Sequence, residues 1–289
     1  MKGSIFTILT LLGAFSASNA SPFKSSAKTR TFVPDTKSMS TIPRGGAGPI
    51  ESLNAAKIAG TISLLQGAYC ALAPKGNAEA YGVEEMSPCT TVAMRRSGIL
   101  LLNTGITIFC QVFKDYSLKT SAAINGLIWV AETLHSLWNN KSETTGPSKA
   151  GDISILALNA VTVYAALNNL DWFMTSLKAF STYWIIAGLP CLFAPKFAMK
   201  LWELKGDDES TPGIVTIVGC NMEISSVLTA ALAWGVEPIT ALGYAAAAAV
   251  VCHTKANLFS PEIDVLNVDR KIRAFWPIYY AAIAASILL

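Results

Sequence analysis

Long apolar runs constrain this chain more than any other feature of its sequence. Eight runs follow residue 50, at approximately 51–73, 89–113, 117–138, 152–170, 176–194, 213–235, 238–256 and 273–289. A helix needs about 20 apolar residues to cross a membrane, and its backbone groups must find their hydrogen bonds within the segment. The runs also lack the alternation of a membrane β-strand. We therefore expect an all-α, multi-pass transmembrane helical bundle of about eight spans.

Composition agrees with this expectation and limits the kinds of partner that the protein can have. The 289 residues are 52% hydrophobic and 14% charged, whereas soluble domains carry about 25% charged residues. The formal net charge is only +3, and no basic stripe interleaves with aromatic residues, so we expect no nucleic acid partner. Membrane lipids are the expected partners, with a membrane protein complex as a further one.

Residues 1–49 have the composition of a targeting sequence. Lys2 precedes a short apolar stretch at 5–15, and small residues at 18–20 offer a cleavage site, which predicts a signal peptide at 1–20. Residues 21–49 are rich in Ser, Thr, Lys and Arg, with Asp35 as their only acid, which is typical of a transit peptide.

Together these two segments resemble the bipartite presequence of algae with secondary plastids, such as diatoms. In that group an aromatic residue follows the signal cleavage site, within a motif like Ala-Phe-Ala-Pro. Here Ala14-Phe15 and Ser21-Pro22-Phe23 match that motif in part. The resemblance implies a secondary plastid membrane. The alternative location is the endomembrane system or the plasma membrane.

The second half of the mature chain repeats the first. CALAPK at 70–75 returns as CLFAPK at 191–196, and further matches pair Lys57 with Lys178, Thr61 with Thr182 and Gly67 with Gly188. Each half continues with three more apolar runs. We therefore expect two four-helix membrane repeats, 50–172 and 173–289. Both should have the same membrane orientation, because an even number of spans returns the chain to its starting side.

The repeated phrase predicts a helix end. Pro74 and Pro195 cannot continue a helix, and the lysine after each can reach the lipid headgroups. Most Lys and Arg residues lie in or beside the loops after runs 1, 3, 5 and 7, so the positive-inside rule puts that side in the cytosol or stroma. We expect the acidic insertion at 206–210 to be a solvated loop.

Polar side chains within the runs are the candidate ligand-binding residues, since such side chains most often mark function. They are Glu132, His135, Asn103, Asn221, Glu223 and His253. Glu132 and His135 lie three residues apart and share a helix face, a spacing found in metal-binding bundles. The second half has Val250 in place of Glu132, so a hydrogen-bonded pair near a helix end is favoured over a metal site.

The two histidines and a pair of arginines are further candidates for a role in the membrane. His135 and His253 are the only histidines and hold equivalent positions, so they could ligate haem iron or chlorophyll magnesium; two satisfied histidines near an interface are the alternative. The sequence therefore does not decide whether the protein binds a cofactor. Arg95 and Arg96 stand near the start of the second run, where snorkelling to the interface would accommodate them.

These patterns favour a protein that binds or carries a small or lipidic ligand between its two repeats. The alternatives are a pigment- or haem-binding protein, a scaffold of a membrane complex, and a membrane enzyme of lipid or isoprenoid metabolism. The helix end at 192–195, Leu-Phe-Ala-Pro, with its basic continuation resembles the ergosterol-biosynthesis scaffold family of four-helix membrane proteins, which implies the scaffold. We predict no catalytic residues, because no Ser/His/Asp order or phosphate-binding glycine loop is present.

Overall fold

The computed structural model describes residues 49–80, 83, 86–139, 148–206 and 208–289. The predicted signal peptide (1–20) and almost all of the predicted transit segment (21–49) lie outside these ranges. The described residues are 84% helical and contain no strand, which confirms the all-α prediction.

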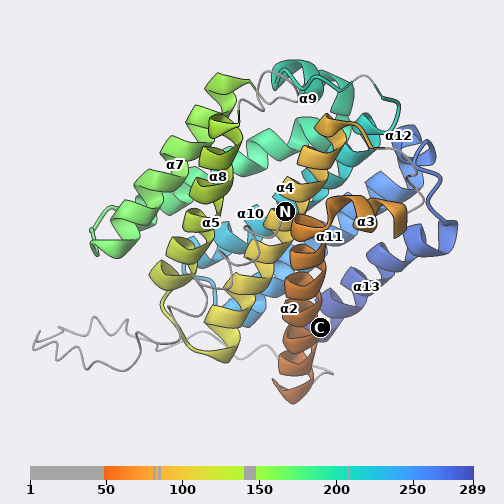
Figure 1. The fold of residues 1–289 in the computed structure, drawn as a ribbon. Helices are drawn as coiled ribbons and strands as arrows, with labels where there is room; N and C mark the ends of the chain where they lie inside the picture. The colour runs from red at the N-terminus through yellow and green to blue at the C-terminus, as the bar shows by residue number, and fades with distance from the viewer. Residues whose placement is uncertain (1–48, 81–82, 84–85, 140–147, 207) are drawn as a thin grey trace, which may run out of the picture. The chain divides into compact units, whose positions relative to one another are not determined.

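Helices follow one another along the whole of the described chain (Figure 1). They are α2 (Pro49–Leu72), α3 (Pro74–Ala80), α4 (Pro88–Ile108) with a π-helical turn η2 (Phe109–Phe113), α5 (Leu118–Trp138), α7 (Lys149–Leu167), α8 (Phe173–Phe193), α9 (Pro195–Leu201), α10 (Thr211–Ala233), α11 (Pro238–Phe259), α12 (Pro261–Asp264) and α13 (Arg270–Leu288). Each predicted apolar run coincides with one of the long helices.

Five of the helices in the described part are long and apolar enough to cross a membrane. They are α4 with η2 (Pro88–Phe113), α7, α8, α10 and α11. The chain is therefore compatible with a membrane protein. The long helices α2, α5 and α13 do not reach the same apolarity, so the arrangement of eight spans stays a prediction.

Local sequence signals explain where the helices begin. The hydroxyl of Ser87 accepts a hydrogen bond from the Thr90 backbone N–H at 3.1 Å, and Pro88 occupies the first turn of α4. Ser117 and Ser148 cap α5 and α7 in the same way. Such caps satisfy backbone N–H groups that the helix itself leaves unpaired.

The repeated phrase ends a long helix in both halves, as predicted. Helix α2 ends at Leu72 and α8 ends at Phe193, and in each case the proline of the phrase then opens a seven-residue helix, α3 or α9. Proline suits the first turn of a helix because its missing N–H would be unpaired there in any case. The two copies of the phrase thus have the same local structure.

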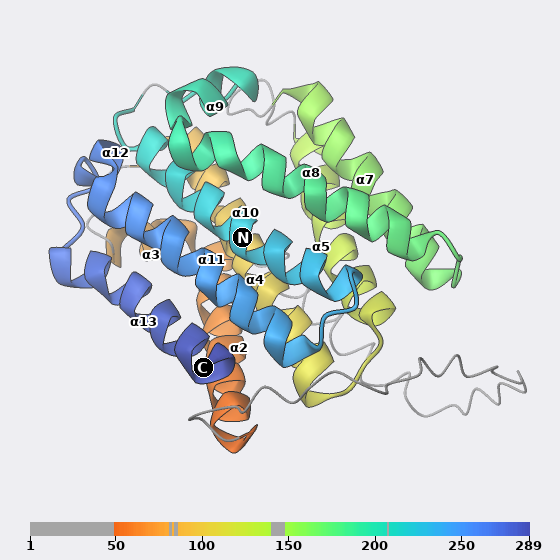
Figure 2. The ribbon, with the colours of Figure 1, turned by 180° about the vertical axis from the view of Figure 1, so that it is seen from behind.

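The long helices form two layers of four. In the first layer α2 packs along α4, α4 contacts α5, and α5 packs along α7; in the second, α8, α10, α11 and α13 follow in the corresponding order. Figure 2 shows the second layer side by side. The layers meet where α4 packs on α10, and also where α13 contacts α2 and α7 contacts α8.

Glycines allow the closest helix contacts. A Cβ atom added to Gly67 of α2 would lie 2.3 Å from the backbone nitrogen of Leu102, and one added to Gly98 of α4 would lie 2.4 Å from that of Ala71. Helices associate in lipid largely through such close packing of small residues. No side chain larger than hydrogen therefore fits these positions unless α2 and α4 move apart.

One carboxylate joins the two layers at the start of α4 and α10. Asp208 accepts hydrogen bonds from the Thr90 hydroxyl at 2.9 Å and from the Thr211 hydroxyl and backbone N–H, both at 2.7 Å. Thr90 and Thr211 are also 2.8 Å apart. The insertion at 206–210 is therefore not simply a solvated loop, as the sequence suggested, because Asp208 is held between two helix N-termini.

The hydrogen bonds also alter the acidity of Asp208. Partial burial acts to raise the pKa of its carboxyl group, but hydrogen bonds from the hydroxyls of Ser210, Ser87, Thr211 and Thr90 together outweigh it and lower the pKa to about 2. The charged form is thus the one that the structure favours.

Candidate functional site

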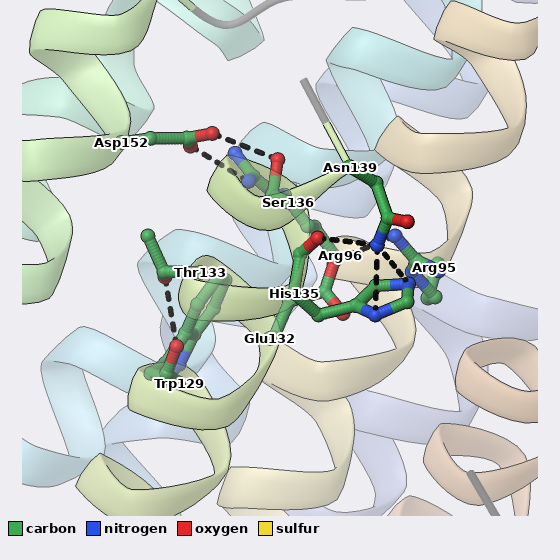
Figure 3. Close-up of polar contacts among 9 residues, drawn as sticks. All are labelled: Arg95, Arg96, Trp129, Glu132, Thr133, His135, Ser136, Asn139 and Asp152. Carbon is green, nitrogen blue, oxygen red and sulfur yellow. Dashed lines mark hydrogen bonds and ion pairs between the residues drawn. The ribbon is translucent and has the colours of Figure 1, made fainter. Parts of the chain in front are cut away.

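A cluster of charged side chains connects α4, α5 and α7 (Figure 3). Arg96 Nη2 lies 2.7 Å from Asp152 Oδ1, and the Ser136 hydroxyl donates to Asp152 Oδ2 at 2.8 Å. The Asp152 side chain is 0% exposed and that of Arg96 is 9% exposed. The expectation that Arg96 snorkels to the interface is therefore wrong, because its guanidinium is buried against a carboxylate from another helix.

The neighbouring residues of this cluster include two predicted ligand-binding residues, Glu132 and His135. Glu132 forms an ion pair with Arg95 at 2.7 Å, and the amide nitrogen of Asn139 lies 3.1 Å from Nδ1 of the exposed His135. The two side chains thus interact with different partners (Figure 3). Among the described residues, no group of three or more His, Cys, Asp or Glu side chains is placed to hold a metal ion.

Glu223 lies apart from this cluster, in α10. It is 5% exposed, and its Oε1 has no hydrogen-bond partner within the described chain. A Cβ atom added to Gly188 of α8 would come within 2.6 Å of that oxygen, so the carboxyl group occupies the space that the glycine leaves. Glu223 lines neither of the cavities described next.

Two of the predicted residues line a largely apolar cavity that the first and second layers enclose together. We call it the apolar cavity. Counted together with the open solvent at its mouth, its space is about 770 Å³, and its walls include Cys70, Met94, Ile214, Leu266, Trp276 and His253. Asn221 also lines it and donates from Nδ2 to the Ser97 hydroxyl at 2.7 Å. This hydrogen bond joins α10 to α4 at the cavity wall.

His253 lines the apolar cavity and has a buried, unpartnered ring nitrogen. The residue is 8% exposed, its ring stacks on Tyr280 and Trp276 at centroid distances of 5.1 and 5.9 Å, and its Nε2 has no hydrogen-bond partner among the described residues. Because His135 is exposed on α5 and lines neither cavity, the structure does not bring the two histidines into one cavity.

Asn103, the remaining predicted residue, lines a second cavity. This polar cavity lies between α4, α5, α7, α8 and α10, and its walls include Asn103, Asn125, Trp129, Asn159, Trp184 and Thr229. It shares no lining residue with the apolar cavity.

Sequence reasoning missed several residues that the structure brings to these places. Asp152, Asn125 and Trp184 were not among the candidates, although Asn125 is a polar side chain within an apolar run, which is the signal that selected Asn103. Asp152 stands at the start of its run, where an acid is also a common helix-start signal. Its partner on α4 could not be identified without the packing of the helices.

Comparison of the chain with protein-family models, with curated proteins and with solved structures finds no match in any of the three.

Proposed function

We propose that this chain is an integral membrane protein of two four-helix repeats that binds a lipid-like ligand in the apolar cavity. The observation that carries the proposal is the unpartnered Nε2 of His253 in the wall of that cavity. A protein that binds such a ligand between its halves is also what the polar residues in the apolar runs predict.

The order of helix contacts supports the two repeats. The pairs α2–α4 and α5–α7 of the first half correspond to α8–α10 and α11–α13 of the second, and the contact of α13 with α2 corresponds to that of α7 with α8. A twofold axis that exchanges the halves would exchange α4 with α10 and so map their contact onto itself. This is the pattern that a twofold axis between the halves would produce.

The orientation of α4 and α10 supports repeats that insert in the same direction. Their N-termini meet at Thr90 and Thr211, 2.8 Å apart, and Ile108 near the end of α4 shares a hydrophobic cluster with Leu228 and Leu232 near the end of α10. The two helices are therefore parallel neighbours.

Glycines at the helix contacts support the same alignment. Gly188 and Gly219 follow Gly67 and Gly98 by the same 121 residues. A Cβ atom added to Gly219 would lie 2.7 Å from the backbone nitrogen of Leu192, so α8 and α10 approach each other as α2 and α4 do. Small residues thus stand at the same crossing in both halves.

The hydrogen bond at the other ring nitrogen of His253 defines what Nε2 can bind. The Asn257 side-chain amide nitrogen lies 3.3 Å from Nδ1. An amide NH₂ group only donates, so Nδ1 accepts and a neutral imidazole carries its hydrogen on Nε2. The free group in the apolar cavity is therefore an N–H donor, which calls for an acceptor oxygen on the ligand.

The walls of the apolar cavity define the rest of the ligand. Met94, Ile214, Ile217 and Leu266 supply apolar surface, and burial of apolar surface is favourable by about 25 cal/mol per Å². Arg273, which also lines the cavity, already pairs with Asp264 and donates to the backbone carbonyl groups of 263 and 268. An uncharged molecule with an apolar body and a carbonyl oxygen fits these walls better than a carboxylate does.

A matched pair of probes tests this ligand class. The full chain in detergent is titrated with 2-dodecanone and with dodecane, and bound probe is measured by native mass spectrometry. The ketone should bind about tenfold more tightly, because one hydrogen bond contributes about 1 kcal/mol or slightly more. The variant His253→Phe keeps an aromatic ring on Trp276 and Tyr280 but removes the N–H, and it should abolish the preference.

The other histidine provides the control for this experiment. His135→Phe makes the same change on the exposed face of α5 and should leave the preference for the ketone intact. Equal binding of both probes to the unmodified protein would refute the role of His253. Binding of neither probe would refute a lipid-like ligand in this cavity.

For the membrane, we propose the secondary plastid membrane, which the resemblance of residues 1–49 to a bipartite presequence implies. Fusing residues 1–49 to a fluorescent protein in an alga with such a plastid tests this part of the proposal. Fluorescence in the plastid supports it, whereas fluorescence in the endomembrane system or at the plasma membrane contradicts it.

A further inference from the structure

The polar cavity contains buried polar atoms that have no partner. Counted together with the open solvent at its mouth, its space is about 620 Å³. Asn103, Asn125 and Trp184 line the cavity, and the buried atoms Asn103 Oδ1, Asn125 Oδ1 and Trp184 Nε1 have no hydrogen-bond partner within the described chain. Asn103 and Trp184 are only 6% and 4% exposed. An unpaired buried polar group is destabilising, so a bound molecule that supplies partners would be favoured here.

Five further polar side chains of the cavity have already used a donor. The hydroxyls of Thr162 and Thr229 donate to backbone carbonyl groups of their own helices at 2.9 and 2.8 Å, and those of Ser121 and Ser181 do the same at 3.1 Å. The Asn159 amide nitrogen also donates to its own helix, at 2.8 Å. What these side chains still offer to the cavity is their oxygen atoms, as acceptors.

Asn125 shows the same imbalance most clearly. Its Nδ2 donates to the Thr107 hydroxyl at 2.9 Å and to the Asn103 backbone carbonyl at 3.2 Å, so only its Oδ1 is left. Trp184 Nε1 is the one unpartnered N–H among the described lining atoms. The cavity therefore accepts several hydrogen bonds and donates at least one.

No acidic or basic side chain lines the polar cavity within the described chain. Its aromatic wall consists of Trp129 and Trp184, whose rings lie 5.5 Å apart, with Phe180 beside them. An ion without a counter-charge is costly inside a membrane protein. An uncharged ligand is thus favoured over an ammonium ion or an anion.

We propose that the polar cavity is a second ligand site, which binds a small uncharged polyol. Hydroxyl groups donate to Asn103 Oδ1 and Asn125 Oδ1, and one hydroxyl oxygen accepts from Trp184 Nε1, so a single molecule with several hydroxyls satisfies all three atoms. The site is independent of the apolar cavity, because the two share no lining residue.

Saturation-transfer NMR on the full chain in detergent tests the site, with glycerol as the probe and methylammonium as its charged counterpart. Glycerol should receive saturation from the unmodified protein, and methylammonium should not. Asn103→Leu and Asn125→Leu each replace the amide by an apolar group with the same branching, so each removes an acceptor, and each should weaken glycerol binding more than tenfold. Trp184→Phe removes the N–H but keeps a ring, and it should weaken binding several-fold.

The control makes the same substitution outside the cavity. Asn168 is exposed at the end of α7, where its amide donates to the Tyr164 carbonyl at 2.9 Å, and Asn168→Leu should bind glycerol normally. Thermal unfolding checks that the cavity variants fold. The midpoint of Asn103→Leu should be no lower than that of the unmodified protein, because the substitution removes an unpaired oxygen, whereas Asn125→Leu should lower the midpoint, because Asn125 Nδ2 also donates to the Thr107 hydroxyl and to the Asn103 carbonyl.

Three results would overturn the proposal. Equal saturation transfer in all variants would show that glycerol binds elsewhere. Transfer to methylammonium in place of glycerol would show a cation site. No transfer to either probe, together with a higher unfolding midpoint for Asn103→Leu, would show a cavity that holds water only.

Discussion

Replacing Asp152 by leucine should destabilise the bundle strongly, because it leaves two buried groups without their partner. Arg96 Nη2 and the Ser136 hydroxyl both bind this carboxylate, at 2.7 and 2.8 Å. The Asp152 side chain is 0% exposed, so water cannot take its place without a change in packing. The variant therefore leaves a guanidinium and a hydroxyl inside the protein with nothing to bind.

The size of the effect follows from these contacts. Removing one partner of a buried ion pair costs about 3–5 kcal/mol, and loss of the acceptor for Ser136 adds about 1 kcal/mol. Asp152→Leu should therefore lower the free energy of unfolding by about 4–6 kcal/mol. Arg96→Met should lower the free energy of unfolding by less, about 2–4 kcal/mol, because the Asp152 carboxylate still accepts from the Ser136 hydroxyl and still lies in the first turn of α7, where a negative charge is favourable.

The double variant isolates the coupling between the two residues. An apolar pair in place of a buried ion pair is often neutral or stabilising, so Arg96→Met with Asp152→Leu should lie within about 1 kcal/mol of the unmodified protein. The two losses should thus be far from additive, as expected for side chains in direct contact.

Unfolding in mixed micelles gives the measurement. The six cysteines are all free and buried, so reaction with a thiol-specific dye during an SDS titration reports the unfolded fraction. Asp264→Asn is the control, because Asp264 is 72% exposed and its pairing with Arg273 should contribute less than about 1 kcal/mol. The reasoning fails if Asp152→Leu costs no more than this control, or if the double variant is no more stable than Asp152→Leu.

Two further predictions concern the contacts between helices. Gly98→Ala should lower the free energy of unfolding by about 2 kcal/mol or more, because the new Cβ would lie 2.4 Å from the backbone nitrogen of Ala71. Gly76→Ala should leave stability unchanged, because the nearest neighbour of its Cβ is a movable tyrosine hydroxyl at 3.0 Å. Equal unfolding midpoints for the two variants would contradict this prediction. Asp208→Asn should lower the free energy of unfolding at pH 7 by about 1 kcal/mol, after allowance for solvent screening of this partly exposed group. Because the pKa of Asp208 falls from 3.8 to about 2 on folding, the unmodified protein should lose this stabilisation as the pH drops from about 4 to 2. The variant should show no such loss, and the same pH slope in both proteins would refute the assignment.

The helices themselves could be predicted from the sequence. Apolar runs fixed where each long helix lies, and the proline of the repeated phrase ended α2 and α8 where expected, because proline acts through its own backbone and needs no partner. These are local properties, so they do not depend on how the chain packs.

The candidate site could be predicted only in part, because it depends on which faces meet. The helices are apolar on most sides, so their sequences do not say which face turns inward. Asn103, Asn221 and His253 were found because a polar side chain in an apolar run is conspicuous. The pairing of Arg96 with Asp152 required a contact between helices 56 positions apart in the chain, which no local pattern contains.

The tie between α4 and α10 has a consequence for how the protein is made. Thr90 and Thr211 are 121 residues apart, and Ser97 and Asn221 are 124 apart. At about 5–20 residues per second, α4 leaves the ribosome roughly 6–24 s before its partner. During that time the hydroxyls of Thr90 and Ser97 are without their partners on α10. The first half then depends on the second for these hydrogen bonds, and the halves produced as separate chains should persist only when they are made together.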